Sequence, residues 1–324
     1  MYCKAIATAV AATAAALTWV SSSFAVEKDD KSLKVGSYNI RCPADKGENA
    51  WDNRRADLVK FMNSLDFDVV GLQEVAPAQA AYIKKYLPQY GMVCEFRNAD
   101  RKSGEASPVC YKKSRFEKLK SGTFWLSETP DVPGSKSWGA AFPRICSWAL
   151  LRDKKTGRAF CFANAHTDHK SVLARREGML LVIRKMGEFA PAGTPIVFTG
   201  DHNCREDEEP AKAVANILKD SIYATETPPK GAWRTFNGWE WRDKECSAAD
   251  ALKLPSEVRN ARKGTEGYKK TGYRIDYVYV SKDVRVKTYD VNANPRRGTK
   301  NYYSDHFPVS ATIVLPARQS PESR

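Results

Sequence analysis

The sequence lacks three features that would place it quickly in a class. It has no CxxC pair, which argues against a zinc ribbon, and no repeat or linker stands out, which favours one domain. After the N-terminus no segment resembles a membrane span. The alanine-rich run 5–20 follows Lys4 and is shorter than the roughly 20 residues that cross a bilayer. With Ser23 and Ala25 at small positions, we expect residues 1–25 to be a signal peptide.

Export would make the mature protein secreted or periplasmic, without stable membrane insertion. An uncleaved N-terminal anchor is the alternative. An exported chain meets an oxidising compartment. Seven cysteines remain once Cys3 is removed with the signal peptide, so at least one is unpaired. Four of them lie in apolar or strand-like runs, where buried free thiols are ordinary: Cys94, Cys110, Cys146 and Cys161.

Acidic residues are too few to balance the basic ones. The chain has 52 Lys and Arg against 38 Asp and Glu, a formal charge of +14. Such an excess favours polyanionic partners such as nucleic acid, phospholipid headgroups or acidic glycans. Part of it is concentrated in residues 111–120 and 259–274, although each stretch alone is equally explained as a solvated face.

Strand-like and helical patterns alternate along the chain and predict one α/β domain over residues 26–324, with a core of about 33–315. Residues 240–272 are polar and basic, and we expect them to run over the surface. The expected strands are 33–40, 68–75, 195–201, 273–281, 284–291 and 309–315, with a hairpin over 147–167. The expected helices are 49–65, 77–90 and 171–189.

Polar residues stand at the ends of these strands, and all four histidines lie among them. Each has a structural explanation when taken alone: Glu74 could cap the next helix, and Asp305 could form an Asx turn. A purely structural explanation fits Asp276 least well, because a lone carboxylate in an apolar strand needs a partner. The set comprises Asn39, Glu74, His166, Asp168, His169, Asp201, His202, Asn203, Asp276, Asp305 and His306.

Together these residues suit the attack of water on a phosphate ester. Glu74, Asp201 and Asp305 are hard oxygen donors fitted to Mg²⁺, with Mn²⁺ or Ca²⁺ as alternatives, and not to zinc. His166 and His306 can move protons near neutral pH. Asp276 could orient one imidazole, and Asn39 and Asn203 could contact a phosphate and its water.

Six motifs in order, "SYNIR", "LQEV", "NAHTDH", "TGDHN", "RIDYVYVS" and "SDHFPV", resemble the endonuclease/exonuclease/phosphatase superfamily with its DNase I-like fold. Residues 124–148 and 233–239 also resemble its exported bacterial branch. The resemblance implies a four-layer α/β sandwich, in which two mixed sheets pack face to face with helices outside. It also implies a divalent-metal phosphohydrolase.

Carried over motif by motif, the resemblance makes Glu74, with Asn39 beside it, the principal metal ligand and Asp305 a further one. Asp201 and Asn203 would position water and phosphate, His306 (oriented by Asp276) and His166 would flank the phosphate, and Arg144 would contact it. The strand period adds that Asn164 shares a face with His166, so Asn164 is a candidate for binding substrate. Asn39 is another such candidate, because its amide could contact a phosphate. By the same period His202 faces away from Asp201 and Asn203; the family usually has an aromatic there, commonly Phe.

The leading hypothesis is therefore an exported, monomeric, Mg²⁺-dependent phosphodiesterase, most simply a nuclease acting on DNA or RNA. A sphingomyelinase-like or inositol-phosphatase-like phosphohydrolase is the alternative, since one fold serves many substrates. A non-catalytic protein or a glycan-binding protein fits less well, because no metal carboxylate or catalytic histidine is missing. We expect Trp233, Trp239 and Trp241 to be core or pocket walls and not a membrane-docking hairpin.

Overall fold

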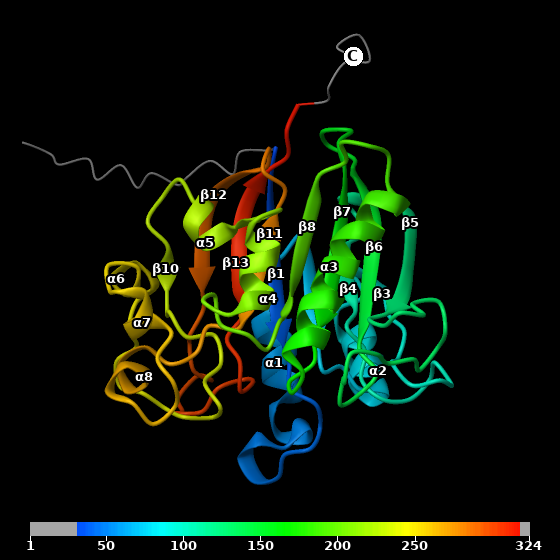
Figure 1. The fold of residues 1–324 in the computed structure, drawn as a ribbon. Helices are drawn as coiled ribbons and strands as arrows, with labels where there is room; N and C mark the ends of the chain where they lie inside the picture. The colour runs from blue at the N-terminus through cyan, green and yellow to red at the C-terminus, as the bar shows by residue number, and fades with distance from the viewer. Residues whose placement is uncertain (1–30, 318–324) are drawn as a thin grey trace, which may run out of the picture.

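The computed structural model describes residues 31–317 and shows two mixed β-sheets packed face to face, with helices on both outer faces (Figure 1). The predicted four-layer α/β sandwich is confirmed. The predicted signal peptide, residues 1–25, lies outside the described residues. Within residues 31–317, no helix combines the length and the apolar character needed to cross a membrane.

The first sheet has seven strands in the order β10-β12-β13-β1-β2-β4-β3. Strand β1 pairs in parallel with β2 and antiparallel with β13, so the sheet is mixed. The strands are β1 (Ser32–Asn39), β2 (Val69–Gln73), β3 (Tyr90–Val93), β4 (Val109–Lys112), β10 (Lys230–Gly231), β12 (Arg285–Val291) and β13 (Val309–Val314).

The second sheet has six strands in the order β5-β6-β7-β8-β11-β9. Here β7 and β8 are the parallel pair, and the predicted hairpin is formed by β6 and β7. The strands are β5 (Phe116–Trp125), β6 (Ile145–Asp153), β7 (Ala159–His166), β8 (Ile196–Asp201), β9 (Lys219–Asp220) and β11 (Asp276–Val280).

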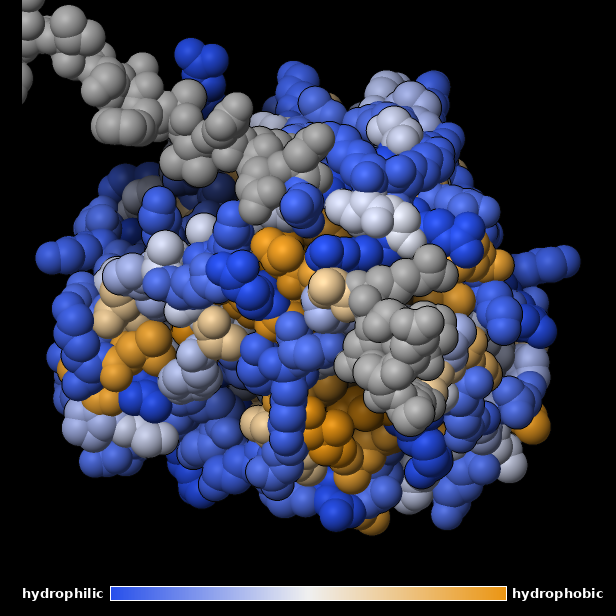
Figure 2. All heavy atoms as spheres, turned by 90° about the horizontal axis from the view of Figure 1, so that it is seen from above, coloured by the Kyte–Doolittle hydropathy of each residue, from blue (hydrophilic) through white to orange (hydrophobic). Residues whose placement is uncertain are grey.

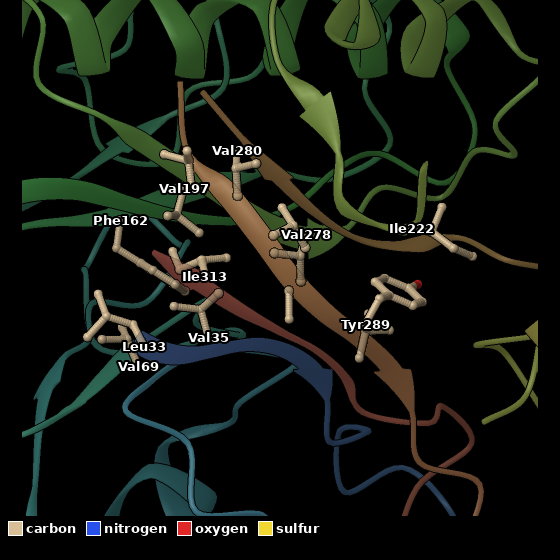
Figure 3. Close-up of a cluster of buried hydrophobic side chains, with 14 of the residues drawn as sticks. Leu33, Val35, Val69, Phe162, Val197, Ile222, Val278, Val280, Tyr289 and Ile313 are labelled. Atoms are coloured by element: carbon tan, nitrogen blue, oxygen red, sulfur yellow. The ribbon is translucent and has the colours of Figure 1, made fainter. Parts of the chain in front are cut away.

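The core between the sheets is built from the inward side chains of their central strands. Val35 of β1 and Val69 of β2 meet Phe162 of β7 and Val197 of β8 across the interface, and all four are inaccessible to solvent (Figure 3). Because β2, β7 and β8 are buried on both faces, their sequences read as continuous apolar runs. That is why the sequence located them.

Helices form the two outer layers. α1 and α2 pack on the first sheet through a cluster that includes Leu58 and Ile83, and α3 and α4 pack on the second through Met179 and Val214. The helices are η1 (Gly47–Asn49), α1 (Trp51–Leu65), α2 (Pro77–Tyr86), α3 (Val172–Phe189), α4 (Glu209–Ala215), α5 (Ser221–Ala224), α6 (Ala248–Ala251), α7 (Ser256–Arg259) and α8 (Glu266–Thr271).

The sequence missed β3, β4 and β5. The basic stretch 111–120 is the end of β4, a turn and the first half of β5, an edge strand whose charged side chains hide it from a hydrophobic pattern. Charges on an edge strand also discourage pairing with other chains. Lys112 forms ion pairs with Asp66 and Asp68, next to the start of β2, so the turn lies at the end of the sandwich opposite Glu74.

Two further expectations need correction. The helix predicted over 77–90 ends at Tyr86, and Tyr90 already begins β3. The stretch 240–272 is not a bare excursion, because it contains α6 to α8, and Ala248 and Ala251 of α6 are fully buried. The top of the molecule in Figure 1 presents a mainly hydrophilic surface, with groups of apolar residues among the hydrophilic ones (Figure 2).

All seven cysteines among the described residues are free thiols, and four of them are buried. Burial raises the pKa of the Cys161 thiol to about 12. A buried neutral thiol behaves as a small apolar side chain. The expectation that Cys94, Cys110, Cys146 and Cys161 lie in apolar surroundings is confirmed, since three are in the core and Cys94 packs against it.

His202 lies in the core between the second sheet and its helices, facing away from Asp201 and Asn203 as the strand period predicted. Its ring stacks on Tyr277 and Tyr279, with centroids 5.5 and 5.7 Å away, and is fully buried. Neither ring nitrogen has a hydrogen-bond partner among the described residues. Burial therefore lowers the pKa of His202 to about 3.

This burial predicts acid sensitivity. The neutral imidazole is required in the folded state, so its contribution to stability is complete above pH 6.5 and is lost as pH falls from 6.5 toward 3, at about 1.4 kcal/mol per pH unit. We expect His202→Phe to reduce this loss, measured as the urea unfolding free energy at pH 7 and pH 4.5. His169→Gln, at an exposed histidine, is the control. An unchanged pH dependence in His202→Phe would show that the ring is not the acid-sensitive group.

Candidate active site

Polar side chains of both sheets meet at the lower end of the sandwich in Figure 1, where β1, β2, β7 and β8 end. His166 and Asp201 are register partners on β7 and β8, and Asp276 is the partner of Asp201 on β11. The turn before β13 brings His306 beside them, as its contacts with Asp276 and Asp201 show. The predicted strand ends therefore do form one site.

The amide of Asn39 joins the acidic residues of this site. Its Nδ2 donates to Glu74 Oε1 and to Asp201 Oδ2, each at 3.0 Å, and its Oδ1 accepts from the backbone N–H of Arg41. Asn39 is fully buried and does not line the pocket described below. The prediction that Asn39 binds substrate is corrected, because its amide is already used within the protein.

Glu74 follows β2 in a left-handed backbone conformation with φ of 59°. This turn aims the carboxylate back toward β1, where Oε2 accepts from the N–H of Cys42 at 3.0 Å. Burial alone would raise the pKa of Glu74, but the hydrogen bonds from Asn39 and Cys42 and the charges of His306 and Arg41 lower it. Glu74 is thus held as an anion.

Asn203 sets the protonation of His166. Its Nδ2 donates to the carbonyl of Thr167 at 3.1 Å, which fixes the amide orientation, so it also donates to His166 Nε2 at 2.9 Å. Nε2 is then an acceptor and the ring is neutral. Burial and the nearby charge of Arg144 lower the pKa of His166 well below its ordinary value, in agreement.

His306 has the opposite character. Its Nδ1 lies 2.8 Å from Asp276 Oδ2, and its Nε2 lies 3.6 Å from Asp201 Oδ2. Burial opposes the charged ring, but the two carboxylates prevail and raise the pKa of His306 to about 10. Asp276 is fully buried and does not reach the pocket, so it acts through His306. Burial raises the pKa of Asp201 to about 7 although His306 opposes this.

Asp305 lies at the rim of this cluster, beside Arg41. The guanidinium of Arg41 is 3.6 Å from Asp305 Oδ2 and 3.7 Å from Glu74 Oε2, and it pairs with Asp45 at 2.8 Å. The fold thus places a positive charge close to both carboxylates. Glu74 and Asp305 offer carboxylate oxygens, which are the ligands that a hard divalent cation prefers. Two sets of possible ligand atoms lie within 4.8 Å of one another: Glu74, His166 and Asp201 form one, and Asp201, Asp276 and His306 form the other.

A pocket of about 680 Å³ opens over these residues. Its floor contains most of the predicted site residues: Glu74, His166, Asp201, Asn203, Asp305 and His306. The pocket is also lined by Phe142 and Arg144, from the loop before β6, and by Phe236, Trp239 and Tyr273. Trp233 is buried in the core, so the expectation that the tryptophans are core or pocket walls is confirmed.

Arg144, which the resemblance places against the phosphate, lines the pocket, and His169 contacts it there. The Nη2 of Arg144 lies 3.2 Å from His169 Nδ1, and Arg144 itself is 6% exposed. His169 stacks on Phe142, whose ring is in turn covered by Arg97. Asp168 accepts the backbone N–H groups of Ala141, Lys170 and Ser171, so it organises the loop and not the chemistry.

Asn164 does not lie in the pocket, and the predicted contact with substrate is wrong. It shares the inner face of β7 with His166 but sits two residues deeper, between the sheets, and is fully buried. Its Nδ2 donates to the carbonyls of Leu72 and Pro108, and its Oδ1 accepts from Gln73. The amide therefore joins the two sheets.

Sequence reasoning missed several pocket residues. Arg41 follows Asn39 in "SYNIR" and was within reach of that motif. Arg175 looked like an ordinary helix arginine, and nothing in the sequence separates it from Arg176. The pocket residues not selected from the sequence include Arg41, Arg97, Phe142, Arg175, Phe236 and Tyr273.

The chain belongs to the Endonuclease/Exonuclease/phosphatase family, whose model matches residues 36–306. Members of this family are metal-dependent phosphoesterases, so the chain is a hydrolase of phosphate esters. This agrees with the buried carboxylates and histidines of the site.

Solved structures of the same fold match most of the chain. A protein of Bacteroides thetaiotaomicron described as a mannosyl-6-phosphatase is 32% identical with a TM-score of 0.73, over 87% of this chain and 100% of that one. A family protein of Bacteroides vulgatus is 29% identical with a TM-score of 0.74, over 88% and 99%.

Curated relatives match less completely. Tyrosyl-DNA phosphodiesterase 2 of Mus musculus is 25% identical over 203 residues, which are 60% of this chain and 45% of that protein. The chain spans between 17% and 59% of the lengths of the curated relatives it matches.

The position of Asn164 predicts a structural role. Asn164→Ala removes the donor to the carbonyls of Leu72 and Pro108 and one acceptor of Gln73, and each buried group that stays unsatisfied costs about 1–3 kcal/mol. We expect a lower urea unfolding free energy and an unchanged KM in the fraction that folds. Asn203→Ala, in the pocket, is the matched control and should act on turnover. A raised KM with full stability in Asn164→Ala would return this residue to the substrate.

The His306–Asp276 pair predicts a pH dependence in the metal-free protein. The raised pKa of His306 means that its ion pairs stabilise the fold fully below pH 6.5 and are lost as pH rises through about 10. Asp276→Asn should lower the His306 pKa. NMR titration of the four imidazoles measures this, with exposed His169 as internal reference. If the His306 resonance titrates identically in both proteins, Asp276 does not hold its charge.

Proposed function

We propose that this family member is a metal-dependent phosphomonoesterase that acts on a small, hydroxyl-rich alcohol phosphate such as a phosphorylated sugar. The observation that carries this is the pocket over the site, which aromatic and basic side chains such as Phe142, Arg144 and Trp239 line. A pocket of about 680 Å³ suits a small ligand. The similarity to a mannosyl-6-phosphatase over 87% of the chain supports the same class.

Glu74 and Asp305 would hold the metal, which we propose to be Mg²⁺, with Mn²⁺ or Ca²⁺ as alternatives. Carboxylate oxygens favour these ions over zinc. When bound, the ion would polarise a phosphate oxygen and offset its charge. Arg41 lies beside both carboxylates. It would either move away when the metal binds or bind the phosphate together with the metal.

The remaining steps fall to the protein's own groups. Asp201, with a pKa of about 7, is placed to accept a proton from the attacking water near neutral pH. His306, kept cationic by Asp276 and Asp201, would donate to a phosphate oxygen. Asn203 would keep His166 neutral beside the phosphate, and Arg144 would bind the phosphate oxygens.

A nuclease is the second candidate. The exposed basic residues Arg262 and Lys263 lie next to the pocket, since the backbone N–H of Lys263 donates to the Tyr273 hydroxyl. Other basic residues support nucleic acid less than their sequence suggested. Arg274 is buried against Glu206 and Asp220, and the stretch 111–120 lies at the far end of the sandwich. We therefore rank the nuclease below the phosphatase.

We also propose that the protein acts outside the cytoplasm, on the strength of the signal-peptide pattern in residues 1–25. Cell fractionation of the full chain tests the export. Retention of the precursor in the cytoplasm would contradict it and leave the chemistry untouched.

Hydrolysis assays test the activity. We expect release of phosphate from sugar 6-phosphates and from p-nitrophenyl phosphate, abolished by EDTA and restored by Mg²⁺. Asp201→Ala and His306→Ala should reduce kcat at least about a hundredfold, as removal of a proton-transfer group does, while circular dichroism shows a folded chain. DNA, RNA, sphingomyelin and inositol phosphates complete the panel. Preferred cleavage of DNA or RNA would select the nuclease, and no EDTA-sensitive hydrolysis of any ester would contradict both.

A further inference from the structure

We propose that Arg175, acting with Arg144, makes the pocket selective for the dianionic end of a phosphomonoester over a monoanionic diester. The inference rests on the proposed function, since it presumes a phosphate ester bound over the site. It assigns a substrate contact to Arg175, which belongs to the first turns of α3 and not to any of the six motifs.

Arg175 is a buried cation without an anionic partner. It is 6% exposed and lines the pocket. Among the described residues, its guanidinium makes one hydrogen bond, from Nη1 to the carbonyl of Asp168 at 3.1 Å, and its buried Nε has no partner. No carboxylate of residues 31–317 lies within ion-pair distance of it. A buried charge is costly unless it is paired, so this group favours an anion from the pocket.

Arg144 also lines the pocket and has only a distant carboxylate, with its Nε 3.9 Å from Asp168 Oδ2. It is also 6% exposed, and its Nε makes no hydrogen bond. Its Nη2 makes one contact among the described residues, with the uncharged nitrogen Nδ1 of His169. Burial lowers the pKa of Arg144, with the nearby Arg97 adding to the effect. Two guanidinium groups are therefore anchored to one short loop and face one pocket.

Asp168 does not neutralise either arginine. Its two carboxylate oxygens accept three backbone N–H groups at 2.8–2.9 Å, and its nearest approach to the Arg144 guanidinium is 3.9 Å. Both carboxylate oxygens are therefore used in hydrogen bonds that hold the loop. The pocket wall consequently keeps two positive charges that no protein group cancels at contact distance.

These charges discriminate between the two kinds of phosphate ester. A monoester carries nearly two negative charges near neutral pH, because its second pKa is about 6, whereas a diester carries one. Attraction to a cation scales with that charge, and it is strong where water is excluded. Removing one arginine should therefore cost the monoester more than the diester.

Arg176 supplies a matched control. It is the next residue on α3 and has the same chemistry, but its side chain is 40% exposed and pairs with Glu177 and Glu209. It does not line the pocket. Its substitution should change neither substrate.

The experiment compares p-nitrophenyl phosphate with bis-p-nitrophenyl phosphate under saturating Mg²⁺. The wild-type protein should prefer the monoester. Arg175→Gln should lower kcat/KM for the monoester by about ten- to a hundredfold, the value of one charged hydrogen bond, and lower that for the diester by clearly less. Arg175→Lys should keep much of the preference, and Arg176→Gln all of it. The inhibition constant for inorganic phosphate should rise with Arg175→Gln.

Three results would overturn the inference. The first is an equal fall in kcat/KM for both esters in Arg175→Gln. The second is an unchanged inhibition constant for inorganic phosphate in that variant. The third is a wild-type protein that hydrolyses the diester as efficiently as the monoester. The last would contradict the proposed phosphomonoesterase as well, whereas the first two concern Arg175 alone and so separate the two proposals. A wild-type protein inactive on both esters would instead contradict the proposed function.

Discussion

One side-chain amide, that of Asn39, ties together the acidic groups on which the site depends. Glu74 belongs to the first sheet and Asp201 to the second, and Asn39 donates to both at 3.0 Å. Two carboxylates brought this close in a buried place repel each other unless donors or cations separate them. The face-to-face packing of the sheets brings the two carboxylates together, and the hydrogen bonds from the Asn39 amide reduce their repulsion.

Charge is arranged in layers above that bridge. His306 is cationic because Asp276 and Asp201 enclose it, and His166 is neutral because Asn203 donates to it. Two histidines a few ångströms from the same carboxylate therefore carry opposite protonation states. Arg41 stands beside the proposed metal carboxylates, and Arg144 and Arg175 line the wall above. The floor attracts cations and the wall attracts anions, which is the polarity that a metal-bound phosphate requires.

The strand end 201–203 shows how one short segment serves two surfaces. Asp201 and Asn203 turn to the pocket, and His202 turns to the aromatic core, where Tyr277 and Tyr279 stack on it. The pKa of Asp201 is raised and that of His202 lowered by the same cause, burial, which always favours the neutral form. Near the pocket that neutrality is useful for proton transfer. In the core it is a source of acid sensitivity.

Much of this protein follows from the sequence by itself. Apolar runs located the central strands, and strand alternation separated His202 from Asp201 and Asn203, because a period of two decides which face a side chain takes. Alternation does not decide depth. Asn164 and His166 share a face, yet only tertiary packing places one between the sheets and the other in the pocket. Strand β5 was missed because its charged side chains hide the apolar pattern, and Arg175 was missed because nothing in the sequence separates it from the exposed Arg176. The sequence determined which groups stand at the strand ends; the packing of the two sheets decided which of them meet.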